Sequence, residues 1–146
     1  MENLLVPCDG SASALQAVRY AAALAAASQR QIQLLHVIEP MTPAALCAAF
    51  AARRLDERFP PQAAHALEPA VRVLDQAGVE HTLHCRFGEP APEIAAHARD
   101  AGSVGIVMGT RGRGALASLV IGSVAIQVLE LVDVPVTLVK EGGAKP

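Results

Sequence analysis

The stretch Gly109-Thr-Arg-Gly-Arg-Gly-Ala-Leu-Ala-Ser-Leu-Val-Ile-Gly-Ser123 separates an apolar run, Val104–Met108, from a helical pattern over Ser123–Leu131. Folds that alternate strands and helices hold phosphate groups at a glycine-rich turn between a strand and the start of a helix. Glycine lets backbone N–H groups approach an anion without an intervening side chain, and the helix N-terminus adds partial positive charge. The stretch therefore predicts an α/β fold with an anion-binding loop.

The charges around this loop favour an anion. Between Ala101 and Gln127 there is no Asp or Glu, and Arg111 and Arg113 are the only charged residues. The two arginines either contact a phosphate or are solvated loop charges, because exposed arginines are common. Alternatively, the glycines have no ligand and form an ordinary tight turn, with one further glycine needed for close packing.

The overall composition indicates one globular domain over residues 1–146, with residues 141–146 as a flexible tail. The chain has 146 residues, of which 52% are hydrophobic, and a formal net charge of −2. Without a long basic cluster the sequence gives no sign of binding to nucleic acid or to an anionic membrane. No apolar run has the length of a membrane span, and no secretory leader is recognisable. We therefore expect a cytoplasmic protein.

The cysteines and histidines do not form a recognisable metal or disulfide pattern. The three cysteines, Cys8, Cys47 and Cys85, are an odd number at unrelated spacings, which indicates reduced thiols. We interpret Cys8 as a small apolar strand residue and His36 as a hydrogen-bonded buried histidine. His81 and His84 are three apart in a predicted strand and face opposite ways, so no metal site is predicted.

Five segments are suited to strands. Val79–Phe87 alternates apolar and polar residues and is predicted to be an edge strand. The others are apolar runs typical of buried parallel strands: Leu4–Val6, Ile32–Ile38, Val104–Met108 and Val134–Val139.

Helical patterns lie between the strands. The first spans Ala12–Ala27 and is capped by Ser11 or Asp9. Another begins at Pro90 or Pro92 and ends near Ala101, with Gly102 as its C-cap. Strands alternating with helices predict a doubly wound parallel sheet with helices on both faces.

The region between the second and third strands is less regular. Ala44–Phe59 has a helical pattern, which Pro60-Pro61 interrupts. A further helix leads from about Pro69 to Ala77. Pro69 either occupies a first helical turn or kinks a longer helix, and the sequence leaves both open.

In open α/β sheets the ligand lies beyond the carboxyl ends of the strands, where the strand order reverses. If the first and fourth strands are neighbours there, Asp9 closes one side of the crevice and Gly109 the other. The Asp9 carboxylate is then placed to accept hydrogen bonds from a ribose hydroxyl, although it also suits a helix cap. Gly112 and Gly122-Ser123 can wrap a polyphosphate, with Arg111 beside it.

At these positions the chain resembles the ATP-binding branch of the universal stress protein family. The signature of that family, Gly-x2-Gly-x9-Gly-[Ser/Thr], is filled by Gly109, Gly112, Gly122 and Ser123. Three further blocks resemble it: the opening Val6-Pro-Cys-Asp-Gly-Ser11, the strand Leu34-Leu-His-Val-Ile38, and the ending Val134-Pro-Val-Thr-Leu-Val139.

The resemblance implies a Rossmann-like, adenine-nucleotide alpha-hydrolase-like sheet of order 3-2-1-4-5 with ATP, or alternatively ADP or AMP, in the crevice. It assigns Asp9 and Gly109 to the ribose and the backbone of Val37 to the adenine, and Gly112, Gly122 and Ser123 to the phosphates. It also implies a homodimer through the last strand, Val134–Val139. A bound triphosphate would normally carry Mg²⁺.

Three functions follow from the sequence. The first is a nucleotide-dependent binding module in the stress response, whose occupancy sets its state toward an unknown protein partner. The second is a slow ATP hydrolase, against which stands a loop without Glu, Asp, His or Lys and a chain without a Gly-Lys-[Ser/Thr] P-loop. The third is a dimer of the branch that binds no nucleotide.

Overall fold

The computed structural model describes residues 1–39, 60–111 and 121–140. Its strands form one parallel sheet in the order β3-β2-β1-β4-β5: β1 (Asn3–Pro7), β2 (Gln31–Ile38), β3 (His81–Phe87), β4 (Gly105–Gly109) and β5 (Val136–Val139). The described helices are α1 (Ala12–Ser28), α3 (Pro61–Ala77), α4 (Pro90–Ala101) and α5 (Ser123–Leu131). The predicted doubly wound sheet and its strand order are confirmed.

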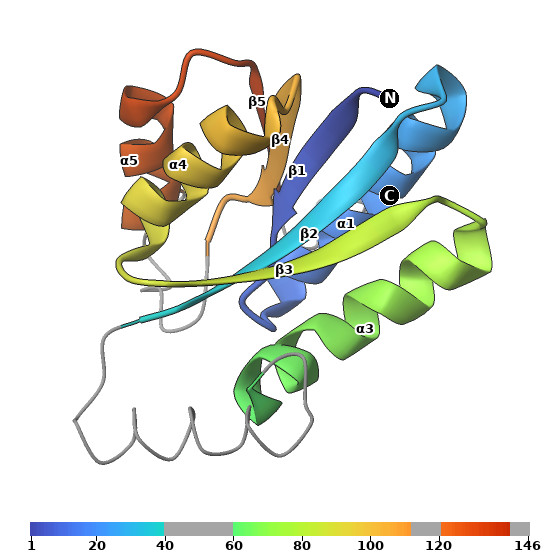
Figure 1. Cartoon of the computed structure of the whole chain (residues 1–146), viewed down its shortest axis with the longest axis horizontal. Coiled ribbons are helices and arrows are strands. Elements are labelled where there is room, and N and C mark those ends of the chain that lie inside the picture. Colours follow the sequence, from blue (N-terminus) through green and yellow to red (C-terminus); the bar gives the residue numbers. More distant parts are fainter. Residues whose placement is uncertain (40–59, 112–120, 141–146) are drawn as a thin grey trace.

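The helices cover the two faces of the sheet in pairs (Figure 1). On one face, α1 and α3 pack on a cluster that includes Val6, Leu34 and Leu74. On the other face, α4 and α5 pack on a second cluster around Leu5 and Ile106. Because the side chains of successive strand residues alternate between faces, an almost wholly apolar strand such as β1 supplies both clusters.

The helix ends follow local sequence signals. Ser11 is the N-cap of α1, and its Oγ accepts a hydrogen bond from the N–H of Ala14 at 3.1 Å. Gly102 ends α4 with a φ of 62°, as predicted, in the left-handed conformation that glycine adopts at little cost. Gly78 ends α3 in the same way.

Helix α3 shows how the two prolines of this region are used. Pro61 occupies the first helical position, where its missing N–H costs nothing, and Pro69 lies inside the same helix on an exposed position. Of the two possibilities left open by the sequence, Pro69 therefore belongs to a longer helix. The apolar spacing across it explains the continuity, because buried positions recur through the helix at Ala63, Ala66, Leu67, Ala70 and Leu74.

The strands β3, β4 and β5 begin one or two residues later than predicted, whereas β1 and β2 begin one residue earlier. Val79 donates its N–H to the carbonyl of Leu74 at 3.0 Å, so it completes the end of α3 before β3 starts. β5 starts at Val136, after Pro135, whose carbonyl accepts from Ile106 of β4. β3 lies at one edge of the sheet, as predicted, and β5 lies at the other.

Several predictions fall outside the described residues. They are the helix Ala44–Phe59, the loop positions Gly112 and Arg113, and the tail 141–146. In the part of the chain that the structure describes, no helix combines the length and the hydropathy needed to cross a membrane.

Candidate nucleotide site at the carboxyl edge of the sheet

The strand order reverses between β1 and β4, which pair through Leu4 with Gly105 and Leu5 with Ile106. After β1 the chain passes into α1 on one face of the sheet, and after β4 it leads toward α5 on the other. Such a point leaves a crevice at the carboxyl edge, because the two connections diverge. Asp9 and Gly109 lie at the two strand ends that border it.

Asp9 shapes the turn that enters α1. Its Oδ1 accepts a hydrogen bond from the N–H of Ser11 at 2.9 Å, and Ser11 in turn caps the helix. Gly10 between them has a φ of +86°, a conformation that residues with a side chain rarely adopt. The helix cap is therefore Ser11, and Asp9 organises the turn that presents its own carboxylate at the strand end.

Gly109 is in close contact with the first turn of α1. A Cβ atom at this position would lie 2.8 Å from the carbonyl carbon and oxygen of Ser13 and would overlap its Oγ. The same Oγ accepts a long hydrogen bond from the backbone N–H of Arg111, at 3.4 Å. The glycine thus lets the buried Ser13 approach the end of β4, whatever ligand the crevice takes.

Thr110 brings the two ends of the glycine-rich loop together. Its N–H donates to the carbonyl of Val139 at 3.1 Å, and its carbonyl accepts a hydrogen bond from the N–H of Gly122. Gly122 and Ser123 therefore lie beside the end of β4, although twelve or more residues separate them from it in the sequence. The N–H of Gly122 is used within the protein, so a phosphate at this place would be met by the next N–H groups along α5.

The N-terminus of α5 has features of an anion site. Gly122 is its N-cap in an extended conformation (φ −74°, ψ 164°), no side chain of the described residues caps it, and its first turn holds no acidic residue. Ser123, the first helical residue, is exposed. The first N–H groups of a helix have no partner within it, and they favour an anion together with the helix dipole.

Val37 lies at the end of β2 beyond the reach of β1. The last register pair of these strands is Pro7 with Leu35, after which Cys8 donates its N–H to the carbonyl of Leu35 at 2.8 Å. Backbone groups of alternate strand residues point to the same side, so those of Val37 point where Leu35 meets β1. No β1 residue pairs with Val37. Its N–H and C=O are thus directed toward the crevice, as a backbone contact with adenine requires.

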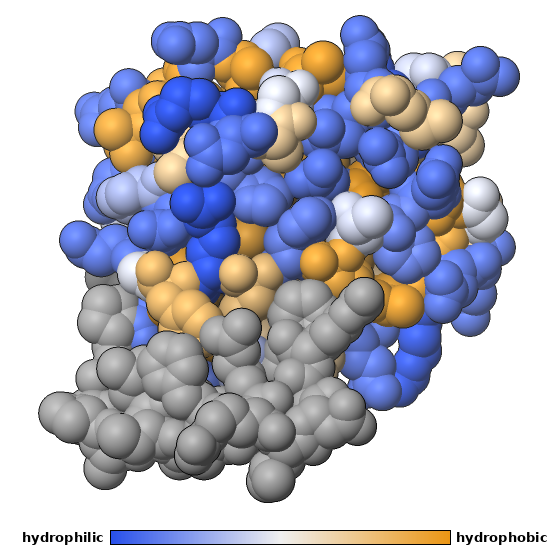
Figure 2. Space-filling model, viewed as in Figure 1, coloured by the Kyte–Doolittle hydropathy of each residue, from blue (hydrophilic) through white to orange (hydrophobic). Residues whose placement is uncertain are grey.

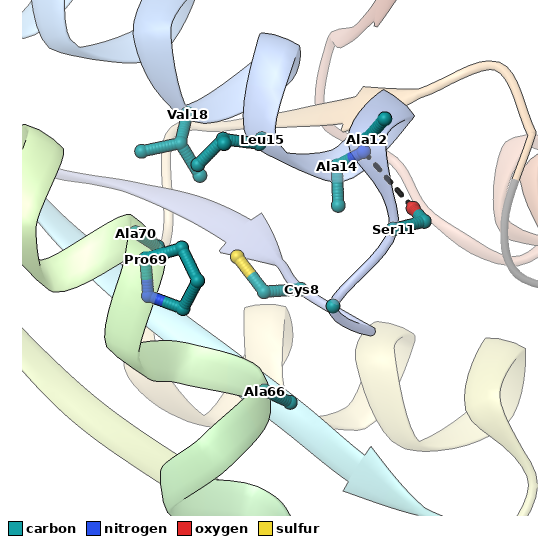
Figure 3. A pocket seen from close by; sticks show the side chains of 10 residues that line it. Cys8, Ser11, Ala12, Ala14, Leu15, Val18, Ala66, Pro69 and Ala70 are labelled. Carbon is teal, nitrogen blue, oxygen red and sulfur yellow. Dashed lines mark hydrogen bonds between the residues drawn. The ribbon is translucent and has the colours of Figure 1, made fainter.

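A separate pocket of about 280 Å³ lies beside the Asp9 turn, between α1 and α3 (Figure 3). Cys8 projects into it near Val18 and Pro69. Burial, with a smaller contribution from the charge of Asp9, raises the pKa of the Cys8 thiol far above its usual value, so the thiol stays protonated. The mostly apolar lining does not suit phosphate, and Cys8 is a packing residue rather than a nucleophile.

Next to Cys8, the His36 ring is held by a hydrogen bond of 2.8 Å between its Nδ1 and the Cys8 carbonyl oxygen. Since a carbonyl only accepts, Nδ1 carries the proton. His36 thus ties β2 to the chain leaving β1. The predicted hydrogen bond is present, but His36 is half-buried rather than buried.

Asp9, Gly109 and Val37 lie at the carboxyl ends of the adjacent strands β1, β4 and β2, and contacts through Ser13 and Thr110 bring Arg111, Gly122 and Ser123 to the end of β4. The structure does not describe Gly112. The sequence reading missed two contributors, Ser13 and Thr110. Their position in the sequence was the signal that could have found them, because each is a small polar residue within four positions of Asp9 or Gly109.

Comparison with known proteins gives one family. A family model described as the universal stress protein family matches residues 1–140. A universal stress protein of Methanocaldococcus jannaschii is 27% identical over 140 residues, covering 96% of this chain and 82% of that protein. One from Bacillus subtilis is 29% identical over 145 residues, covering 94% of this chain and 98% of that protein.

Solved structures share the fold. The structure of the hypothetical protein MJ0577 superimposes with a TM-score of 0.77 at 27% identity, covering 95% of each chain. A universal stress protein in complex with cAMP has a TM-score of 0.73 at 23% identity, covering 97% of this chain and 98% of the other. One from Archaeoglobus fulgidus in complex with dAMP has a TM-score of 0.72 at 22% identity, covering 96% and 98%.

Proposed function

Because the chain belongs to the universal stress protein family, we propose that it is a cytoplasmic, nucleotide-dependent regulatory module of the stress response that binds an adenine nucleotide at the β1–β4 crevice. One observation carries the proposal. The Thr110–Gly122 hydrogen bond brings the ends of the glycine-rich loop together, so the N-terminus of α5 lies beside the end of β4, the strand that neighbours β1 at the switch point. Two structural neighbours were solved with cAMP and dAMP, both adenine nucleotides.

In this proposal each part of the nucleotide has a matching chemistry. The Asp9 carboxylate accepts hydrogen bonds from the ribose, and the backbone of Val37 pairs with the adenine edge. Ser123 and the following N–H groups of α5, with Gly112 and Arg111, contact the phosphates. ATP with Mg²⁺ is the proposed ligand, since the loop holds no acidic residue to repel a triphosphate.

We propose binding rather than efficient hydrolysis. Phosphoryl transfer to water needs a group that orients the water and groups that neutralise the γ-phosphate. The loop supplies arginines but no Glu, Asp, His or Lys for the first task. Steady ATP turnover by purified protein, abolished by Gly122→Val, would show that the module is an enzyme.

Calorimetric titration of nucleotide-stripped protein tests the proposal. ATP, AMP and cAMP are each titrated with and without Mg²⁺, and we expect ATP–Mg²⁺ to bind with micromolar affinity at about one site per chain. Tighter binding of AMP or cAMP than of ATP would support the proposed site but show that its preferred ligand is a different adenine nucleotide. No heat with any nucleotide at two temperatures would instead place the chain in the branch that binds none.

Replacing Asp9 with alanine is expected to weaken ATP binding by about tenfold to a hundredfold, because a hydrogen bond to a charged acceptor is worth about 1.5–3 kcal/mol. Ser11→Ala is the matched control. It removes the helix cap and about 1 kcal/mol of stability but leaves the carboxylate in place, so its ATP affinity should stay near that of the parent protein. Equal affinities for Asp9→Ala and the parent would reduce Asp9 to a turn residue.

We also propose that the protein is a homodimer through the last strand. β5 is an edge strand, and the carbonyls of Pro135 and Val139 face β4. The N–H groups of Val136 and Leu138 therefore point outward, away from β4. An apolar edge of this kind invites pairing with a second chain.

Val136→Pro tests this interface, because it removes an outward N–H without touching a hydrogen bond to β4. We expect the variant to shift from dimer to monomer in analytical ultracentrifugation at micromolar concentration. Val136→Ala is the control, since it shortens the side chain and keeps the N–H, and should remain dimeric. A Val136→Pro variant that stays dimeric would move the interface elsewhere, for example to α5, where Ile126 and Leu129 are 47% and 46% exposed.

A further inference from the structure

A polar network joins α4 to the β2–β3 edge of the sheet. His97 of α4 is only 8% exposed, and both of its ring nitrogens are engaged. Nε2 lies 2.8 Å from Oε1 of Gln33 on β2, and Nδ1 lies 3.4 Å from Nη1 of Arg86 on β3. The imidazole therefore contacts two strands at once, across 64 residues of sequence in the case of Gln33.

The partners fix the protonation state of His97. A guanidinium only donates hydrogen bonds, so Nδ1 must be the unprotonated acceptor. The single proton of the neutral ring is then on Nε2, which donates it to the amide oxygen of Gln33. A second proton, on Nδ1, would face the N–H of Arg86 and replace an attraction with the repulsion of two cations.

The titratable and charged side chains near His97 come from β3 and from α4 itself. On β3, the His84 ring lies 4.7 Å from the His97 ring, centre to centre, and its Nε2 is 2.8 Å from Oγ1 of Thr82. The guanidinium of Arg86, also on β3, forms ion pairs with two carboxylates of α4, that of Glu93 at 2.8 Å and that of Asp100 at 3.5 Å. The two carboxylates attract the guanidinium and favour its position next to the imidazole.

Burial, His84 and Arg86 lower the pKa of His97 to about 4, against a smaller opposing effect of Asp100. Burial also lowers the pKa of His84. Because folding lowers the pKa of His97, the neutral ring stabilises the folded state relative to the unfolded chain at neutral pH. That contribution is lost as the pH falls from the ordinary value of 6.5 toward about 4, because the released state takes up the proton more readily.

We propose that the network of His97, His84, Arg86 and Gln33 is a proton-sensitive lock, which holds α4 against the β2–β3 edge at neutral pH and releases it on acidification. The lock is independent of the proposed nucleotide function. The molecular face over β3 and α4 is largely hydrophilic (Figure 2), so water can reach the network as soon as α4 moves. Arg86 also pairs in register with Val37, which places the lock beside the end of β2.

Urea unfolding at pH 7 and pH 5 tests the lock with a non-titrating variant. In His97→Gln the amide can still donate to Gln33 and accept from Arg86, but it takes up no proton. Between the two pH values, the unfolding constant of the parent protein should rise about tenfold or more relative to that of His97→Gln. His65→Gln removes an exposed histidine on α3 and should behave as the parent does. Parallel pH dependences of the parent and His97→Gln would overturn the proposal.

NMR on the parent protein tests the same lock without any variant. At pH 7 the His97 ring should be in the Nε2–H form, and its titration should begin well below pH 6.5. The backbone amides of α4 and β3 should shift together with that titration, while those of α1 should not. A His97 ring that titrates without changes in α4 and β3 would show a buried histidine and no lock.

Discussion

Gly109→Ala is expected to lower the melting temperature by about 9 °C, although the substitution adds a single methyl group. The added Cβ would lie 2.8 Å from the carbonyl carbon and oxygen of Ser13. These are backbone atoms of a helix, so no rotamer change relieves the contact, and α1 or β4 must shift. Overpacking of this kind costs about 3 kcal/mol, and each kcal/mol lowers the melting temperature of a chain this size by about 3 °C.

Gly78→Ala separates this steric effect from the general cost of replacing a glycine. Gly78 has a φ of +69°, and a Cβ there would meet no atom of the described residues within 4 Å. Its replacement should cost about 1 kcal/mol for the left-handed backbone alone. Thermal unfolding followed by circular dichroism measures both variants. Equal decreases in melting temperature would mean that α1 moves away from β4 easily. Gly109 would then be needed for ligand binding rather than for the packing of α1.

The architecture was predictable because its signals are local. Almost wholly apolar runs indicate strands that are covered on both faces, as with β1, and the alternation in Val79–Phe87 indicates the edge strand β3. The helix that contains Pro69 was harder to predict from the sequence. Pro69 alone favours a helix start or a kink, whereas the recurring buried alanines and leucines on both sides of it require one helix. The packing of a whole face outweighs one missing hydrogen bond.

The placement of the candidate site residues was predictable in outline, because Asp9 follows β1, Gly109 ends β4, and the sheet order makes these two strands neighbours. What the sequence does not contain is the set of contacts between distant segments. The approach of Ser13 to Gly109 and the bond from Gly122 to Thr110 depend on how α1 and α5 settle on the sheet. The network around His97 also depends on contacts between distant segments. The register in which β2 and β3 pair decides that Gln33 and Arg86 both lie near His97.

Gly122→Val is expected to reduce ATP affinity tenfold or more while the domain stays folded. Gly122 is buried at the N-cap of α5, and its own N–H is bonded to Thr110, so the conformation at this position is fixed. Its φ of −74° is open to valine, which means that the backbone tolerates the change. The branched side chain would instead fill space in front of the first N–H groups of α5, where the proposal places the phosphates.

Ser123→Ala is the matched control at the neighbouring position, because it removes one hydroxyl donor and adds no bulk. It should weaken ATP binding by less than the valine substitution, because it removes one hydrogen bond to a charged phosphate, worth about 1.5–3 kcal/mol, and leaves the neighbouring N–H groups of α5 accessible. Both variants are titrated calorimetrically after thermal unfolding without nucleotide has shown that they fold. If Gly122→Val binds ATP as the parent does, the phosphates lie elsewhere. The Thr110–Gly122 bond would then serve only to close the loop, and the signature glycine would be architectural.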